Sequence, residues 1–307
     1  MTEYDYPLYR PPSEAYSLII QATLGCSQNK CTFCSMYKSK KFTIKPLEQI
    51  KKEIDFFRIY VKKAERIFLA DGDALIMPMK ILKEIFIYIN EKFPEAERIS
   101  LYGSPKSILL KTPEELLELK NLGLGLIYLG VESGSDKILS SVKKGVSREE
   151  IIAAGKKVKK VGIPLSVTAV AGLGGKENSI EHAVETASLI SEINPDYFGV
   201  LTLMLEEGTE LLEEYKKGNF IPLSSSEILE ETKLMIKNIN VKEKCIFRSN
   251  HASNYVSLKG TLPYEKENIF SNILKKKIDE FENSFEERNE ELSNIKKSIY
   301  EYLSKEV

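Results

Sequence analysis

Near its start the chain reads Leu18-Ile-Ile-Gln-Ala-Thr-Leu-Gly25-Cys26-Ser-Gln-Asn-Lys-Cys31-Thr-Phe33-Cys34. An apolar segment of strand length leads here into a loop that holds three of the four cysteines within nine residues. Thiolates this close together repel one another unless a metal takes up their charge. An iron–sulfur cube normally uses four thiolates, so three leave one iron without a protein ligand, where a substrate or cofactor could bind. We therefore expect Cys26, Cys31 and Cys34 to hold a metal centre.

The cysteines leave two other interpretations open. One is a zinc site in which Cys245, far away in the sequence, supplies a fourth ligand. The other is three unrelated buried thiols.

The rest of the chain alternates strand-like segments with helical patterns. The helices are expected from about residues 46, 78, 113, 147, 179 and 209. The strands are expected at residues 17–24, 66–70, 98–102, 125–131, 165–171 and 197–205. This alternation predicts parallel strands joined by right-handed helical crossovers. Polar and glycine-rich turns follow the strands, so they share the face of the sheet where barrels of this kind do their chemistry. Six units favour an α/β fold with a partial (β/α)6, TIM-like barrel, and a doubly wound sheet is the competing fold.

The rhythm changes after about residue 222. A helix follows the cap Ser224, and then come a short strand-like piece at residues 245–248 and a polar run. From Pro263 onward the sequence predicts Lys- and Glu-rich helices. We expect residues 1–222 to form the barrel with an extended N-terminal arm, and residues 223–307 to form a mainly helical extension that packs on it.

The composition excludes several classes of protein. The chain has 44 basic and 45 acidic residues, which give a formal net charge of −1. This balance argues against a general binder of nucleic acid or membrane surfaces. A local patch would still permit a specific RNA substrate. The longest apolar runs are of strand length, and the first residues lack a signal-peptide pattern. Few cysteines, three of them clustered, favour the reducing cytoplasm.

Three further motifs lie at the ends of predicted strands, and a fourth, Lys143-Lys144-Gly145, lies further along the chain. They are Asp71-Gly72-Asp73-Ala-Leu75, Gly130-Val-Glu132-Ser133-Gly134-Ser135-Asp136, Lys143-Lys144-Gly145 and Val170-Ala-Gly172-Leu-Gly174-Gly175-Lys-Glu177. A turn without bulky side chains lets the backbone approach a ligand. A carboxylate directly after an apolar strand, such as Glu132, is costly to bury without a partner.

Together with the cysteines, these motifs resemble the radical S-adenosylmethionine (radical SAM) superfamily. The likeness is to the branch of coproporphyrinogen dehydrogenases, tRNA methylthiotransferases and Elongator-type enzymes, over roughly residues 15–205. The resemblance implies that Cys26, Cys31 and Cys34 hold a 4Fe–4S cluster, whose fourth iron binds the methionyl group of S-adenosylmethionine (SAM). The usual spacing is C-x3-C-x2-C, whereas this chain has C-x4-C-x2-C. The loop is therefore one residue longer than expected.

The resemblance also implies roles in holding SAM. Gly72 and Asp73 would contact the methionyl amine, and Lys144 the methionyl carboxylate. Glu132 and Ser133 would contact the ribose, and Gly172 and Gly174 the adenine. Simpler interpretations stand beside them. The Asp-Gly turn could be ordinary, Ser135 and Asp136 could only cap the next helix, and Lys144 could be a surface lysine.

The resemblance implies that SAM is cleaved reductively to methionine and a 5′-deoxyadenosyl radical, which abstracts hydrogen from a small-molecule or macromolecular substrate. An electron donor such as flavodoxin or ferredoxin, and anaerobic conditions, are expected. The alternative function is an iron–sulfur electron-transfer or sensor protein that does not cleave SAM. We expect Arg248, Asn250, His251 and Tyr255 of the polar run to contact the substrate, unless this run is a hydrogen-bonded loop that closes the barrel's edge.

Overall fold

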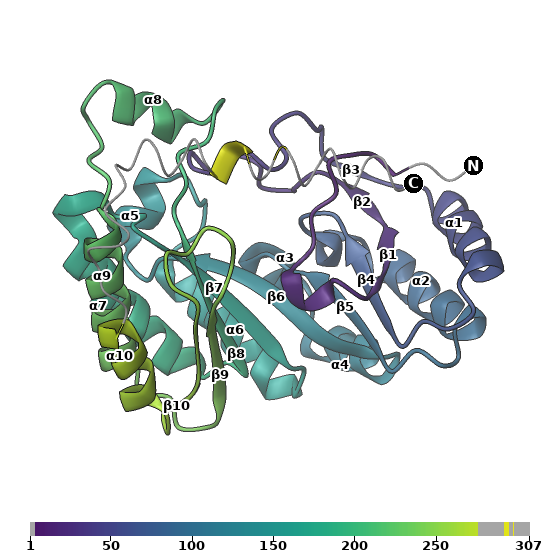
Figure 1. Ribbon diagram of the computed structural model, residues 1–307. Helices are drawn as coiled ribbons and strands as arrows, with labels where there is room; N and C mark the ends of the chain where they lie inside the picture. Colours follow the sequence, from purple (N-terminus) through teal and green to yellow (C-terminus); the bar gives the residue numbers. More distant parts are fainter. Residues whose placement is uncertain (1–3, 276–291, 295–296, 298–307) are drawn as a thin grey trace. The chain divides into compact units, whose positions relative to one another are not determined.

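The computed structural model describes residues 4–275, 292–294 and 297 (Figure 1). Its centre is an eight-stranded sheet in the order β1-β4-β5-β6-β7-β8-β9-β10. These strands are β1 (Leu18–Gln21), β4 (Arg66–Ala70), β5 (Arg98–Tyr102), β6 (Leu124–Glu132), β7 (Leu165–Ala171), β8 (Tyr197–Thr202), β9 (Cys245–Ser249) and β10 (Leu258–Leu262). A separate pair consists of β2 (Thr23–Leu24) and β3 (Thr43–Ile44).

The order of the strands in the sheet follows their order in the chain. Within the sheet, strands β1, β4, β5 and β6 pair in parallel, as do β8 and β9, whereas β10 runs antiparallel to β9. A doubly wound sheet reverses its strand order near the middle, so that competing fold is excluded. The predicted α/β fold is confirmed, as a mostly parallel sheet whose strands follow one another in chain order.

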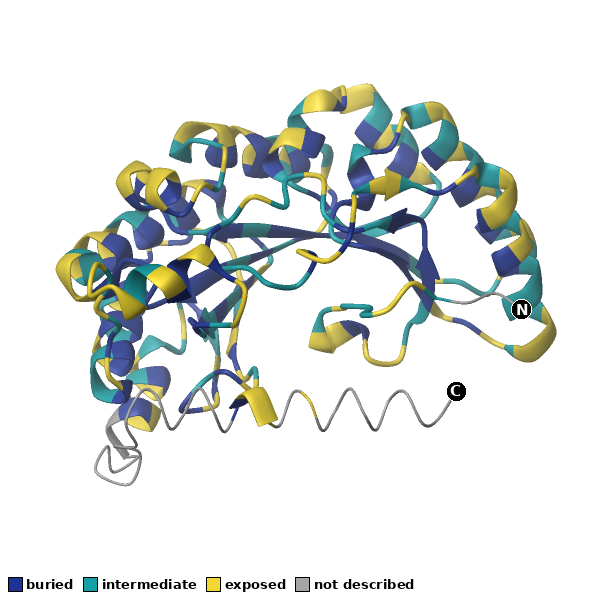
Figure 2. Ribbon diagram, turned by 90° about the horizontal axis from the view of Figure 1, so that it is seen from above, coloured by how far each residue is buried: buried dark blue, intermediate teal, exposed yellow. Residues whose placement is uncertain are grey.

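Ten α-helices lie among the described residues. They are α1 (Leu47–Tyr60), α2 (Met79–Lys92), α3 (Pro105–Leu110), α4 (Pro113–Asn121), α5 (Asp136–Ser141), α6 (Arg148–Val161), α7 (Gly175–Ile193), α8 (Glu210–Lys216), α9 (Ser225–Asn238) and α10 (Lys266–Lys275). Thr112, Ser147 and Ser224 begin α4, α6 and α9 with complete capping boxes, which satisfy backbone N–H groups that a helix start leaves unpaired. Figure 2 shows most helices exposed on one side and buried on the other, whereas the strands are mostly buried. None of these helices combines the length and the apolar character that a membrane span requires.

The structure contains elements that the sequence analysis did not predict. Helices α3 and α5 have six residues each, and β2, β3 and β10 are short as well. Helix α7 begins at Gly175, four residues before the expected start. Elements as short as α3, α5, β2 and β3 hold too few apolar residues for a helical or strand period to be recognised in the sequence. The helices expected beyond residue 275 lie largely outside the described residues.

The chain divides into two compact units, and each is described by itself below. Of the described residues, unit 1 contains 4–30, 36–131 and 145–167, and unit 2 contains 31–35, 132–144 and those from 168 onward. The cysteine loop is shared between them, with Cys26 in unit 1 and Cys31 and Cys34 in unit 2. The expected boundary near residue 222 stays a prediction.

In unit 1 the N-terminal arm lies against the strands. Tyr4 and Leu8 pack on a buried cluster formed by residues of β1, β4 and β6. The Tyr4 hydroxyl donates to the Ile19 carbonyl (2.7 Å), and the Asp5 N–H donates to the Gln21 side chain (2.9 Å). The arm therefore covers apolar strand residues that would otherwise face water.

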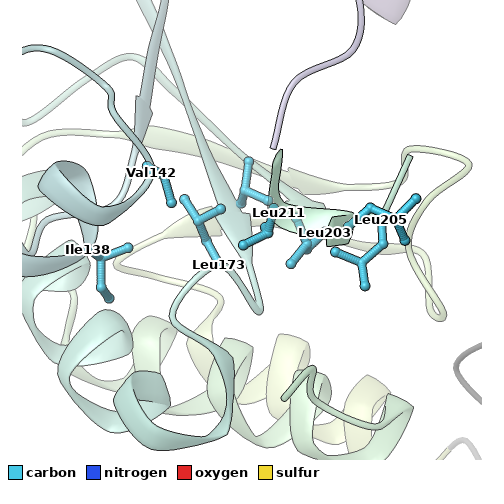
Figure 3. Packing of buried hydrophobic residues seen from close by; sticks show 8 residues of the cluster. Ile138, Val142, Leu173, Leu203, Leu205 and Leu211 are labelled. Atoms are coloured by element: carbon cyan, nitrogen blue, oxygen red, sulfur yellow. The ribbon is translucent and has the colours of Figure 1, made fainter. Parts of the chain in front are cut away.

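In unit 2 a second cluster joins the strand ends to the neighbouring helices. Its labelled members in Figure 3 are Ile138, Val142, Leu173, Leu203, Leu205 and Leu211. Phe33, between the second and third cysteines, packs against this cluster. The buried apolar surface thus anchors the second half of the cysteine loop.

Candidate cofactor site

The backbone just before the first cysteine is held on both sides. The Gly25 N–H donates to the Asp71 carboxylate (Oδ2, 3.1 Å), and the Gly25 carbonyl accepts from the Gly72 N–H (3.0 Å). Gly25 has φ +74°, a left-handed conformation that glycine adopts without strain. The turn after β4 therefore fixes the peptide that leads into Cys26.

Gly72 lies where no side chain would fit. A Cβ at this position would come within 2.7 Å of the Tyr37 ring and 3.0 Å of the Cys26 Cβ. The sequence predicts here a turn without bulky side chains that lets the backbone approach a ligand. Glycine is required here partly because the turn lies so close to the first cysteine. A contact of Gly72 with the methionyl amine stays a prediction.

Asp73 is completely buried and accepts three hydrogen bonds. Its carboxylate receives the Ser104 N–H (3.0 Å) and hydroxyl (2.8 Å) at the start of α3, and the Ser27 hydroxyl from the cysteine loop. Asp73 therefore links two strand-end turns to the loop, which is more than an ordinary Asp-Gly turn requires. Its role toward the methionyl amine remains a prediction.

Asp71 was not among the predicted site residues. It is completely buried, and its Oδ2 also accepts from the Gln21 amide (3.1 Å) and the Lys40 ammonium (3.2 Å). Its Oδ1 has no hydrogen-bond partner. Burial raises the pKa of Asp71, an effect that the Gly25 N–H and the Lys40 charge oppose.

In unit 2 the other two cysteines lie on a segment held by backbone hydrogen bonds. The Thr32 N–H donates to the Val142 carbonyl (3.0 Å), and the Thr32 carbonyl accepts from the Leu211 N–H (3.0 Å). Cys31 and Cys34 on either side are half-buried, and neither forms a disulfide. These bonds give both thiols a fixed local backbone.

The zinc alternative receives no support from Cys245. That thiol is completely buried in β9. Among the described residues, no three Cys, His, Asp or Glu side chains are grouped so that they could hold one metal ion. A 4Fe–4S cluster does not need such a cage, because each of its thiolates binds a different iron.

The structure brings two predicted SAM contacts together at the end of β6. The Lys144 ammonium donates to the Glu132 carboxylate at 2.7 Å, and only 13% and 14% of these side chains are exposed. Glu132 has φ +61°, in the left-handed region that non-glycine residues rarely adopt. Lys144 is thus not a solvated surface lysine, because it forms an ion pair with Glu132.

Ser133 is completely buried and faces helix α7. Its hydroxyl lies 2.9 Å from His182 Nδ1, and His182 Nε2 lies 3.0 Å from the Val170 carbonyl. Because a carbonyl only accepts, Nε2 carries the proton and Nδ1 accepts from Ser133. Burial lowers the pKa of His182 to about 4, which keeps the ring neutral and suits a structural role between these two partners. Ser135 caps α5, as the simpler interpretation of that motif holds.

The glycines after β7 approach parts of the protein itself. A Cβ on Gly172 would come within 2.7 Å of Ile228 on α9, and one on Gly174 within 3.0 Å of the Asn178 carbonyl. The Gly172 N–H donates to the buried Glu231 carboxylate (2.6 Å). Close approach is therefore confirmed within unit 2, and approach to an adenine stays a prediction.

Glu231 is a residue that the sequence analysis missed. It also accepts from the Ser179 hydroxyl (2.6 Å), and burial raises its pKa to about 7. A signal existed in the sequence, because Glu231 shares the apolar face of α9 with Ile228 and Met235.

The four predicted substrate contacts lie at the end of β9, which includes Arg248, and in the polar run after it. Arg248 and Asn250 are exposed, His251 is half-buried and Tyr255 is buried. The His251 ring accepts from the Ser253 N–H (3.1 Å). Only the first two side chains are therefore fully available to a ligand without rearrangement.

The same run is fixed to the end of β8. The Thr202 N–H donates to the Ser253 hydroxyl (3.2 Å). The Asn254 side chain accepts from the Thr202 hydroxyl (2.9 Å) and donates to the Val200 carbonyl (2.9 Å). These contacts are those expected of a hydrogen-bonded closing loop. Substrate binding by Arg248, Asn250, His251 and Tyr255 stays a prediction.

Comparison with known proteins identifies the family. The model of the Radical SAM superfamily matches residues 20–189, more than half of the chain. A putative methylthiotransferase of Methanocaldococcus jannaschii is 32% identical over 155 residues, which cover 49% of this chain and 34% of that protein. A tRNA-2-methylthio-N(6)-dimethylallyladenosine synthase of Methylacidiphilum infernorum is 27% identical over 212 residues, 64% of this chain and 42% of that protein.

The fold has relatives among solved structures. Coproporphyrinogen III oxidase from Escherichia coli, a radical SAM enzyme, superposes with a TM-score of 0.56 at 17% sequence identity, over 72% of this chain and 52% of that one. At 17% sequence identity, this superposition shows a similar fold and nothing further. The chain spans between 34% and 52% of the length of these three proteins.

Proposed function

The chain belongs to the radical SAM superfamily, whose enzymes use a 4Fe–4S cluster and SAM, and on this premise we propose that Cys26, Cys31 and Cys34 hold the cluster. The bound cluster and SAM together would supply reductive cleavage to methionine and a 5′-deoxyadenosyl radical, which takes hydrogen from an unidentified substrate.

One observation carries the proposal. The three thiols that the sequence groups within nine residues are outside disulfides, and each lies on backbone that hydrogen bonds already fix. In unit 1 the turn at Asp71 and Gly72 holds the peptide before Cys26, and Gly72 leaves no space for a side chain beside it. The donor set and its supports therefore fit a cluster bound by three cysteines.

The chain's own residues would bind and orient SAM. Glu132, held by Lys144, presents a carboxylate of the kind that accepts hydrogen bonds from a vicinal diol such as ribose. Asp71 Oδ1, a buried acceptor without a partner, and Asp73 supply negative charge beside Gly72, which suits the methionyl ammonium. We place the substrate at Arg248, Asn250, His251 and Tyr255.

The proposal also includes an electron donor and a compartment. An electron carrier of the flavodoxin or ferredoxin type would reduce the cluster, and a reducing, anaerobic cytoplasm suits thiols outside disulfides and a reactive radical. The formal charge of −1 gives no general affinity for nucleic acid.

Anaerobic reconstitution tests the proposal. Purified protein is loaded with iron and sulfide, reduced with dithionite, and given SAM, and 5′-deoxyadenosine is measured. We expect about four iron atoms per chain and steady formation of 5′-deoxyadenosine. Cys31→Ala should remove both, whereas Cys245→Ala, the matched cysteine control, should retain both.

Two outcomes would contradict the proposal. A loaded cluster that yields no 5′-deoxyadenosine would favour the electron-transfer or sensor function. Loss of metal in Cys245→Ala, with zinc in place of iron in the purified protein, would favour the structural zinc site.

A further inference from the structure

The loop between the first two cysteines has one residue more than the usual spacing, and its residues have specific contacts in unit 1. The Ser27 hydroxyl donates to Asp73. The Gln28 side chain packs on Gly145, where a Cβ would lie 2.3 Å from its amide nitrogen. The third residue, Asn29, makes the contacts on which we build.

Asn29 bridges two parts of the loop that are separated by the other cysteines. Its side-chain amide donates to the Tyr37 carbonyl (2.7 Å) and the Lys40 carbonyl (3.3 Å). In return its own carbonyl accepts from the Lys38 ammonium (3.1 Å). Asn29 has φ +36°, and asparagine is among the few non-glycine residues that enter the left-handed region readily.

These bonds close the base of a loop. The chain leaves unit 1 after Lys30 and returns to it at Met36, and the five residues between carry two of the three cysteines. The segment that begins at Tyr37 is in turn fixed by Lys40, which pairs with the buried Asp71 (3.2 Å). Closing a loop in advance removes conformational freedom that ligand binding would otherwise have to restrict.

We propose that Asn29 is a positioning residue that accommodates the additional residue of the C-x4-C spacing and clips the base of the cysteine loop, so that the loop retains its cluster. The inference rests on the proposed function. Asparagine suits the role because it combines two amide donors with tolerance of a positive φ. Aspartate would keep that tolerance and lose both donors, and glycine would keep only the backbone freedom.

The experiment compares reconstituted Asn29→Ala, Asn29→Asp and Asn29→Gly with the original protein. Asn238→Ala is the matched control, because Asn238 also donates to a backbone carbonyl, that of Leu234 (2.8 Å), on α9. Three quantities are measured: the rate at which a ferrous chelator removes iron, the electron paramagnetic resonance spectrum of the reduced cluster, and the melting temperature of the metal-free protein.

We expect all three Asn29 variants to take up the cluster and to release iron about tenfold faster, the scale of two lost hydrogen bonds. The resonance spectrum should shift, because the ligand geometry changes. The melting temperature of the metal-free Asn29→Gly protein should fall by only a few degrees, the scale of two hydrogen bonds in a chain of this size. Asn238→Ala should match the original in iron release and spectrum.

The inference is overturned if the Asn29 variants release iron at the original rate with an unchanged spectrum, or if only the melting temperature falls. If Asn29→Ala does not fold, Asn29→Gly decides, since glycine adopts this φ without strain. If the original protein binds no iron–sulfur cluster at all, the proposed function fails, and the inference fails with it. A loaded original protein with equally stable variants removes the inference alone.

Discussion

Glu132 and Lys144 were predicted to meet different parts of SAM, yet they form an ion pair with each other. Both side chains are mostly buried, so removing one partner would leave a poorly solvated charge. Lys144 therefore has two possible modes of action. It either orients Glu132 or reaches the methionyl carboxylate itself. The two modes differ in whether the effects of replacing Glu132 and Lys144 on SAM binding are coupled.

A double-mutant cycle separates the two modes. If Lys144 acts by holding Glu132, then Glu132→Gln and Lys144→Met each weaken SAM binding by about tenfold, or about 1.4 kcal/mol. The double variant should then bind no more weakly than Glu132→Gln alone. Calorimetric titration of the reconstituted protein with SAM measures the affinities.

Lys143→Met is the control for that cycle. Lys143 is the neighbouring lysine and pairs with Glu210 on the surface, so its loss should leave SAM binding unchanged. Additive effects of Glu132→Gln and Lys144→Met would show instead that each side chain contacts SAM on its own.

At the scale of elements, helix α9 braces the turn after β7. Glu231 on α9 accepts the Gly172 N–H and the Ser179 hydroxyl, and its side chain lies 3.9 Å from the buried His182 ring. Burial raises the pKa of Glu231 to about 7 and lowers that of His182 to about 4. The two groups make stability depend on pH in opposite directions.

Glu231 stabilises the fold at acidic pH. Its folded pKa lies above the ordinary value of 4.5, so its contribution is fully present below pH 4.5 and is lost as pH rises to about 7. The shift corresponds to about 3 kcal/mol. For His182, with a lowered folded pKa, stability is present above pH 6.5 and is lost as pH falls toward 4.

Glu231→Gln isolates the first effect, because His182 is common to both proteins. We expect the difference in unfolding free energy, variant minus original, to rise by about 3 kcal/mol between pH 4.5 and pH 8. Urea denaturation at several pH values measures it. A difference that stays constant with pH would mean that Glu231 ionises normally in the folded protein.

The strands and longer helices could be predicted, because their apolar residues repeat over enough positions to set a period. The short helix α3 could not, although Ser104 and Pro105 carry the sequence signals of a cap and a first turn. The contacts of the site were less predictable. That Lys144 meets Glu132, and that Gly172 meets α9, depends on distant segments brought together by packing, which no local spacing encodes.

At the scale of the whole molecule, the near-zero net charge hides a local excess. Residues 25–45, which include the cysteine loop, contain five lysines and no Asp or Glu. Two of these lysines are buried in ion pairs, and Lys30, Lys38 and Lys41 are exposed without an acidic partner among the described residues. An exposed positive surface on the loop that would hold the cluster suits a small acidic electron carrier.

Charge reversal tests this surface. With flavodoxin as donor, Lys30→Glu combined with Lys41→Glu should raise the KM for the donor about tenfold at low salt, because long-range attraction speeds encounter. The difference should disappear toward 0.5 M salt, about where screening shortens the Debye length to a few ångströms. With dithionite, which needs no docking, 5′-deoxyadenosine formation should be unchanged.

The matched control is Lys62→Glu combined with Lys63→Glu. These exposed lysines lie just before β4, at the opposite end of the parallel strands. An equal rise of KM in both double variants would show that only net charge, and not the cysteine loop, attracts the donor.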